Sequence, residues 1–301
     1  MKKNTDLTRR EFIKGAAGIA GATVLASCGL SGDALEAFLQ KHFKELSNDE
    51  KAEILKRIED ECKAKYGKEV AVVGTPAEEG VLFAYALDIS RCIGCRRCVY
   101  GCREENNQSR DPQIHWITVL EMDKSEGVNL EKANSYYEVD KVPQPDKFYF
   151  PVACQQCENP PCVKVCPVKA TWKEPDGIVV VDYNWCIGCR CCITACPYGA
   201  RHFNWAEPKI PADELNPNMH YLGNRPRMKG CVEKCTFCIQ RTRGEEKKYP
   251  KCVEVCPVGA RKFGNLLDPS SEIRYILANK RVFIFKEELN TRPKFFYYYG
   301  L

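Results

Sequence analysis

Sixteen cysteines in four groups constrain this chain more than any other feature of its sequence. Each group holds four cysteines within a short stretch, and a proline follows the last cysteine of groups two, three and four. A pattern that recurs along one chain indicates an internal repeat. Group one is Cys92, Cys95, Cys98 and Cys102; group two is Cys154, Cys157, Cys162 and Cys166; group three is Cys186, Cys189, Cys192 and Cys196; group four is Cys235, Cys238, Cys252 and Cys256.

The spacing within the groups predicts iron-sulfur chemistry. Groups one and three have the C-x2-C-x2-C-x3-C spacing of bacterial ferredoxins, in which three thiolates bind one cluster and the fourth ligates the neighbouring cluster. Backbone N-H groups of such a tight loop can point at the sulfides. We therefore expect all sixteen cysteines to bind metal, as ligands of four [4Fe-4S] clusters, and we find no catalytic residue.

Two other uses of cysteine fit the pattern less well. Zinc sites pair two C-x2-C units across a longer arm, and a disulfide framework does not require one spacing in four copies. Four cysteines are left over. Cys191 or Cys231 could each replace a neighbouring ligand, but the repeat favours Cys192 and Cys235. Cys62 lies on an apolar helical stripe and is expected to be buried.

The first 28 residues resemble a twin-arginine export signal. Arg9 and Arg10 precede an apolar stretch, residues 15–26, that is too short to span about 30 Å of hydrocarbon. Residues 25–28, Leu-Ala-Ser-Cys, resemble a lipobox, so Cys28 is either lipidated or removed with the leader. We expect the protein at the extracytoplasmic face of the cell membrane.

The chain divides into four expected segments and an α+β fold. The signal with its candidate lipobox covers residues 1–28, a helical hairpin and linker 29–79, and a four-cluster ferredoxin domain 80–268. A C-terminal helix, strand and aromatic tail follow at 269–301. Ser47 and Glu50 form a capping-box pattern for the second helix of the hairpin. The ferredoxin domain should contain tandem βαβ-type units in two pseudo-symmetric pairs, with a short strand at 178–182.

Two further stretches have weaker patterns. Residues 205–230 contain four prolines and little periodicity, which predicts a loop over groups three and four that is ordered by its contacts. It would serve either as a docking surface or to shield the clusters. The aromatic run at 295–299 fits either a strand packed on the domain or an interface. Arg96, Arg97, Arg190 and Arg201 lie near the cysteine loops, where arginine either tunes a potential or faces solvent.

Composition excludes several functions. The formal net charge of +5 includes +3 from the first 28 residues, so the remainder is too weakly charged for a nucleic-acid partner. The sequence has no convincing Ser/His/Asp order, phosphate loop or dinucleotide fingerprint. We therefore expect an electron-transfer subunit of an oxidoreductase, without a substrate active site of its own.

Three stretches resemble a known family over about residues 83–266. "DISRCIGCRRCVYGCREEN", "ACQQCENPPCVKVCPVKATWKEPDGIVVVDYNWCIGCRCCITACPYGARHF" and "EKCTFCIQR" with "KCVEVCPVGARKFGNL" are similar to the four-cluster beta subunits of polysulfide reductase, dimethyl sulfoxide reductase and formate dehydrogenase. The resemblance implies that groups one and four, and groups two and three, exchange their last cysteines. The implied ligand sets are Cys92, Cys95, Cys98 and Cys256; Cys235, Cys238, Cys252 and Cys102; Cys154, Cys157, Cys162 and Cys196; and Cys186, Cys189, Cys192 and Cys166.

The leader shifts the resemblance toward one branch of that family. Many such subunits are exported with a molybdenum partner that carries the signal, whereas this chain resembles the self-targeted iron-sulfur subunit of sulfite-reduction-associated or heterodisulfide-reductase-like menaquinol oxidoreductases. The implied partners are a multispanning quinone-interacting membrane subunit and a c-type cytochrome, with membrane association through the partner and through a lipidated Cys28. The alternative is a subunit feeding a molybdopterin reductase of the polysulfide, tetrathionate, dimethyl sulfoxide or nitrite type. A freestanding soluble ferredoxin needs neither the leader nor the terminal extensions.

Overall fold

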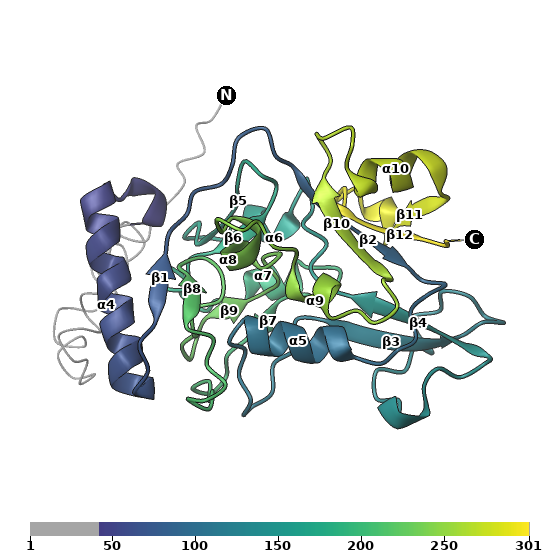
Figure 1. Ribbon diagram of the computed structural model, residues 1–301, viewed down its shortest axis with the longest axis horizontal. Coiled ribbons are helices and arrows are strands. Elements are labelled where there is room, and N and C mark those ends of the chain that lie inside the picture. Colours follow the sequence, from purple (N-terminus) through teal and green to yellow (C-terminus); the bar gives the residue numbers. More distant parts are fainter. Residues whose placement is uncertain (1–41, 301) are drawn as a thin grey trace.

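Short helices and small sheets make up the protein, as the computed structural model of residues 42–300 shows (Figure 1). The fold is α+β, as expected, and most of its sheets have two strands. The helices are η1 (Phe43–Glu45), α4 (Asn48–Tyr66), α5 (Arg97–Glu105), η2 (Val139–Lys141), α6 (Pro161–Lys164), α7 (Cys191–Thr194), α8 (Ile239–Thr242), α9 (Lys251–Glu254), α10 (Glu272–Asn279) and η3 (Glu287–Leu289). The strands are β1 (Ala71–Val73), β2 (Phe83–Asp88), β3 (Thr118–Asp123), β4 (Lys147–Val152), β5 (Thr171–Lys173), β6 (Val179–Val181), β7 (His202–Phe203), β8 (Asn218–His220), β9 (Val232–Glu233), β10 (Arg261–Asn265), β11 (Val282–Ile284) and β12 (Phe295–Tyr298).

The largest sheet joins the C-terminal residues to the cysteine-rich part of the chain. Its strand order is β10-β2-β12-β11, with β12 parallel to β2 and β10 antiparallel to it. Phe295 and Tyr297 of β12 are buried, and Ile273 and Ile276 of α10 pack against the alanines of β2. Of the two interpretations left open for the aromatic run, the structure therefore supports a strand within the domain.

Helix α4 lies at the edge of the molecule (Figure 1). The capping box predicted at its start is present: the Ser47 amide donates to Glu50 Oε2 at 2.8 Å, and the Glu50 amide donates to Ser47 Oγ at 3.2 Å. Cys62 is 6% exposed, which confirms its expected burial. The first helix of the expected hairpin, like the signal and Cys28, lies for the most part outside residues 42–300, and residues 43–45 form a 3-10 turn.

Residues 205–230 are ordered by their contacts, as expected, and they also contain a short strand that the sequence did not predict. The strand is β8, which pairs in parallel with β1. This pairing uses backbone groups at the edge of β1, and the hydropathy pattern of a sequence does not reveal such partners. The segment also reaches group one, since the side-chain amides of Asn216 and Asn224 both donate to the Glu105 carbonyl. It therefore ties the N-terminal residues to the cysteine-rich part.

Within the part of the chain that the structure covers, no helix has the length and apolar character that crossing a membrane requires.

Candidate metal centres

One backbone turn recurs in all four cysteine groups. The residue directly before the second cysteine has a positive φ in each: Gly94 (72°), Gln156 (44°), Gly188 (70°) and Phe237 (55°). At Gly94 a Cβ would lie 2.4 Å from the ring of Tyr149, so no side chain fits. Left-handed backbone is uncommon for residues such as Gln156 and Phe237, and such conformations concentrate at functional sites.

The ends of groups two, three and four also share one geometry. The residue three positions after the last cysteine has a positive φ, and its amide donates to that cysteine's carbonyl: Lys169 at 3.3 Å, Gly199 at 3.4 Å and Gly259 at 3.2 Å. Group one differs because no proline follows Cys102 and helix α5 continues to Glu105. Three copies of the repeat are thus closely alike, and the first has a longer helix.

Two cavities are each bordered by four of the predicted ligands. Cys92, Cys95 and Cys98 border one of them with Cys256. The other is bordered by the group-three cysteines Cys186, Cys189 and Cys192 and by Cys166 of group two. Helix α5 packs against α9, and α6 against α7, which brings the fourth cysteine across from its distant group.

The remaining eight predicted ligands form two further sets. Cys102 interacts electrostatically with Cys235, Cys238 and Cys252. Cys157 interacts in the same way with Cys154, Cys162 and Cys196. The side-chain amide of Asn106 lies between Cys102 and Cys238, with its nitrogen 3.6 Å and 3.4 Å from the two sulfurs. The structure therefore brings all sixteen cysteines into four neighbourhoods.

The four sets adjoin one another in a row. Cys98 of the first set interacts with Cys252 of the second, Cys235 of the second with Cys154 of the third, and Cys192 of the fourth with Cys162 of the third. The second and third sets therefore each adjoin two others.

The chemistry of the donors fits iron-sulfur clusters. Each set consists of cysteines alone, and all-cysteine ligation is the rule for [4Fe-4S] clusters. No three Cys, His, Asp or Glu side chains between residues 42 and 300 are arranged to hold a single metal ion. Burial raises the pKa of Cys92, Cys157 and Cys235 to about 12 each. Because metal binds the thiolate, cluster binding must displace these protons.

Two buried arginines contact predicted ligands. Arg201 donates from Nη2 to Cys162 Sγ at 3.0 Å, and Arg261 donates from Nη2 to Cys98 Sγ at 3.1 Å. Arg201 was among the arginines singled out in the sequence, whereas Arg261 was missed. A signal for both exists, because each is the fifth residue after the last cysteine in the repeated pattern C-P-x-G-A-R.

Two of the leftover cysteines, Cys191 and Cys231, border neither of the two cavities. Cys191 is exposed, and Cys192 rather than Cys191 borders the cavity of the fourth set. Cys231 is buried, and its thiol donates to the Met228 carbonyl at 3.1 Å.

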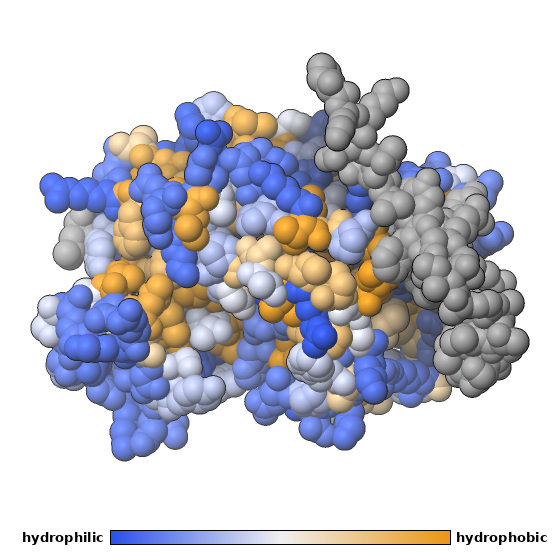
Figure 2. Space-filling model, turned by 180° about the vertical axis from the view of Figure 1, so that it is seen from behind, coloured by the Kyte–Doolittle hydropathy of each residue, from blue (hydrophilic) through white to orange (hydrophobic). Residues whose placement is uncertain are grey.

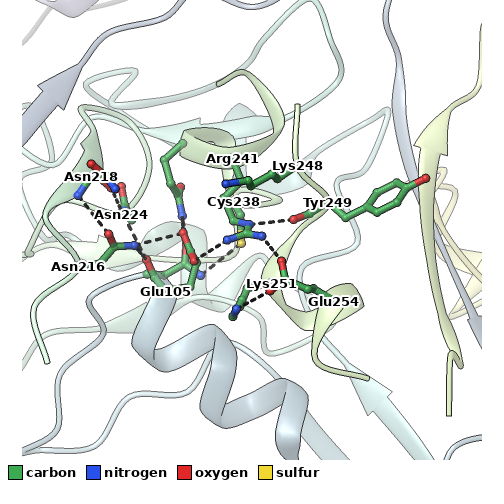
Figure 3. A network of polar contacts seen from close by, with 12 residues as sticks. Glu105, Asn216, Asn218, Asn224, Cys238, Arg241, Lys248, Tyr249, Lys251 and Glu254 are labelled. Carbon is green, nitrogen blue, oxygen red and sulfur yellow. Dashed lines mark hydrogen bonds and ion pairs between the residues drawn. The ribbon is translucent and has the colours of Figure 1, made fainter. Parts of the chain in front are cut away.

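A polar network holds the helices of groups one and four together (Figure 3). Arg241 of α8 donates from Nη1 to Glu105 Oε2 at 3.0 Å and also pairs with Glu254 of α9. Gln240 donates to the same carboxylate at 3.0 Å, and Asn216 to the Glu105 carbonyl at 2.9 Å. The network therefore fixes α5 against α8, α9 and the 205–230 segment, directly beside Cys238.

Comparison with known proteins identifies the family. A model of the 4Fe-4S dicluster domain matches residues 145–215. The chain is 41% identical to the Hdr-like menaquinol oxidoreductase iron-sulfur subunit 1 of Archaeoglobus fulgidus, over 71% of this chain and 82% of the relative. It is 40% identical to a putative dimethyl sulfoxide reductase iron-sulfur subunit of Halobacterium salinarum (72% and 79%). It is 34% identical to the menaquinone reductase iron-sulfur cluster-binding subunit of Nitratidesulfovibrio vulgaris (72% and 88%). The chain belongs to the family of iron-sulfur electron-transfer subunits of membrane-associated reductases.

Proposed function

We propose that this chain relays electrons through four [4Fe-4S] clusters between a quinone-interacting membrane subunit and a second redox subunit, such as a c-type cytochrome. The observation that carries the proposal is the row of four cysteine sets, each adjoining the next. When bound, each cluster would supply a one-electron redox centre whose potential depends on its surroundings.

The proposed ligands are the sixteen cysteines of the four groups, with the last cysteines exchanged within two pseudo-symmetric pairs. Cys256 completes the set of Cys92, Cys95 and Cys98, and Cys166 completes that of the group-three cysteines. These two assignments are supported by the two cavities. Cys102 with group four, and Cys196 with group two, are supported by their electrostatic neighbours.

The protein's own residues would shield the clusters and supply donors to their ligands. Three of the four ligands of the second set, Cys102, Cys238 and Cys252, are buried, which limits the access of water to it. The side-chain amide of Gln108 lies 3.2 Å from Cys102 Sγ, and Tyr85 Oη 3.4 Å from Cys252 Sγ. Donors to ligand sulfurs and low solvent exposure are two ways in which a protein sets a cluster's potential.

The quinone-linked assignment is supported by two relatives. The names of the Archaeoglobus and Nitratidesulfovibrio proteins refer to menaquinol and menaquinone. The Halobacterium relative favours the alternative, in which the chain delivers electrons to a molybdopterin reductase. Apolar surface also lies in the middle of the back face, bordered by hydrophilic residues (Figure 2), as on subunits that bind partners.

The proposed place of work is the extracytoplasmic face of the cell membrane. Its support is the leader, with Arg9, Arg10 and the apolar stretch before Cys28. Export in a folded state suits a chain with twenty cysteines, because cluster assembly needs reduced thiols and an oxidising compartment promotes disulfides. Membrane association would come from the partner, assisted by a lipid on Cys28 if that residue is retained.

Copurification tests the proposal. The chain is tagged at its C-terminus, membranes are solubilised gently, and the recovered complex is analysed for haem c, molybdenum and multispanning subunits. We expect haem and a multispanning subunit without molybdenum. Stoichiometric molybdenum would overturn the quinone-to-cytochrome assignment and establish the alternative, and recovery of the chain alone in the soluble fraction would contradict both.

A further inference from the structure

Two buried arginines occupy equivalent positions in the two halves of the cluster domain. Arg201 follows Cys196 by five residues, and Arg261 follows Cys256 by five residues. They are 4% and 3% exposed. Each begins or directly precedes a strand, β10 for Arg261 and β7 for Arg201.

Each arginine contacts the cysteine group opposite its own. Arg261, which follows group four, donates to Cys98, the third cysteine of group one, at 3.1 Å. Arg201, which follows group three, donates to Cys162, the third cysteine of group two, at 3.0 Å. Arg261 therefore contacts the set that Cys256 would complete, and Arg201 contacts the set that Cys196 would complete.

The other partners of both guanidinium groups are neutral. Arg261 Nη1 lies 3.0 Å from Tyr85 Oη, and Arg201 Nη2 lies 2.9 Å from Thr171 Oγ1. Among residues 42–300, neither arginine forms an ion pair with a carboxylate. A buried cation is costly unless a negative charge compensates it, and the anions placed to do so here are the cysteine thiolates and what they bind.

We propose that Arg261 and Arg201 are matched positioning residues that each act chiefly on one cluster and raise its reduction potential. Arg261 acts on the cluster closed by Cys256, and Arg201 on the one closed by Cys196. The proposal rests on the ligand sets given under the proposed function. Reduction adds a negative charge to a cluster, so a buried cation that donates to a ligand sulfur favours the reduced form. A charged donor also forms the stronger hydrogen bond.

The donors to the sulfurs of the second set are neutral. Asn106 and Gln108 supply neutral amides to Cys102 and Cys238 of the second set. In group two, the position five residues after Cys166 is Thr171. Lys234 lies near Cys235, but its ammonium donates to the Cys235 and Val179 backbone carbonyls rather than to a sulfur. Arg201 also borders the cavity of the fourth set and interacts with Cys192. Its 3.0 Å contact with Cys162 should give its largest effect on the third set, whereas Arg261 borders the cavity of the first set and should act there.

The test is a redox titration of the full, cluster-loaded chain, purified anaerobically and followed by electron paramagnetic resonance. Arg261→Gln and Arg201→Gln should each lower the midpoint of one spectral component, by at least about tenfold in the oxidised-to-reduced equilibrium, or ~59 mV for one electron. The two substitutions should move different components, and the double variant should move both. Arg→Lys variants, which keep the charge, should recover part of each shift.

Arg225→Gln is the matched control. Arg225 is buried and bonds to the Tyr221 carbonyl and to Asn184 Oδ1, with no contact to a cysteine sulfur, so its loss should leave all midpoints in place. Unchanged midpoints in the cluster-loaded Gln variants, or a shift of the same component by both, would overturn the proposal. If a Gln variant loses its cluster, the Lys variant decides: a fully loaded Lys variant with the wild-type midpoint supports the charge effect, and loss of the cluster there too refutes it. Fewer than four components in the wild type would instead refute the proposed function, independently of the arginines.

Discussion

Groups two and three, and groups one and four, reach similar geometry by different routes. The first pair is local: its cysteines fall within residues 154–196, and hairpin β5–β6 lies between its two loops. The second pair spans residues 92–256 and closes through the pairing of β2 with β10 and the packing of α5 on α9. Nevertheless, an arginine contacts the third cysteine of the opposite group in both. Ligand spacing therefore specifies the loops, while long-range contacts decide how the second pair meets.

The two pairs also differ in exposure. Each pair has several buried ligands, four in the long-range pair and three in the local pair, but only the local pair has an exposed one, Cys189. A pair that closes over a long stretch of chain loses more loop-closure entropy. Half-buried contacts such as the Glu105–Arg241 ion pair help to offset that cost. The local pair needs fewer such contacts.

The largest expected effect breaks the exchange of ligands between groups. Cys256→Ala should remove the fourth ligand of the first set, so that iron per chain falls by about four atoms. Cys196→Ala should do the same in the local pair. Iron and acid-labile sulfide analysis measures both losses, and full iron content in either variant would contradict the assigned ligand. Changes in different spectral components would show that the two residues serve different clusters.

An ion pair between the two halves gives the next effect. Arg243, at the end of α8, bonds to Asp176 in the β5–β6 turn at 2.7 Å, and both side chains are fully buried. Arg243→Met should cost about 3–5 kcal/mol in the free energy of unfolding, because it leaves a buried carboxylate unpaired. Anaerobic urea denaturation measures the change. Adding Asp176→Leu should recover most of the loss, and no recovery would show that the ion pair is not the cause.

The free energy of unfolding should depend on pH through a buried histidine in β8, the strand that contacts α8 of group four. Burial lowers the pKa of His220, in β8, from its ordinary value of 6.5 to about 4. Folding favours the neutral imidazole, so its stabilisation is complete above pH 6.5 and is lost as the pH falls toward 4. The shift corresponds to about 3 kcal/mol. His220→Gln should reduce the loss of unfolding free energy between about pH 7 and pH 5, and an unchanged pH dependence would contradict this account.

The smallest effect sharpens the choice between adjacent cysteines. Cys191 is exposed and outside the cavity of the fourth set. Cys191→Ser should therefore keep the full iron content and change the unfolding free energy by less than about 0.5 kcal/mol. Cys192→Ser is the matched comparison and should lose cluster. Equal iron loss in the two variants would mean that Cys191 is a ligand as well.

Local patterns were predicted well, because their causes lie within a few residues. The capping box of Ser47 and Glu50 sets the start of α4, and the strand expected at 178–182 appears as Val179–Val181. Strand β8 and the place of β12 beside β2 could not be predicted, since their backbone partners lie far away in the sequence. The contact of Arg261 with Cys98 spans 163 residues, so in the sequence only the repeated C-P-x-G-A-R pattern indicates it.

The most direct test of the central claim is the metal content of the anaerobically purified chain. Four clusters predict about sixteen irons and as many sulfides per chain, with four components in a redox titration. About eight irons, or zinc in place of iron, would contradict the assignment of all sixteen cysteines to four [4Fe-4S] clusters.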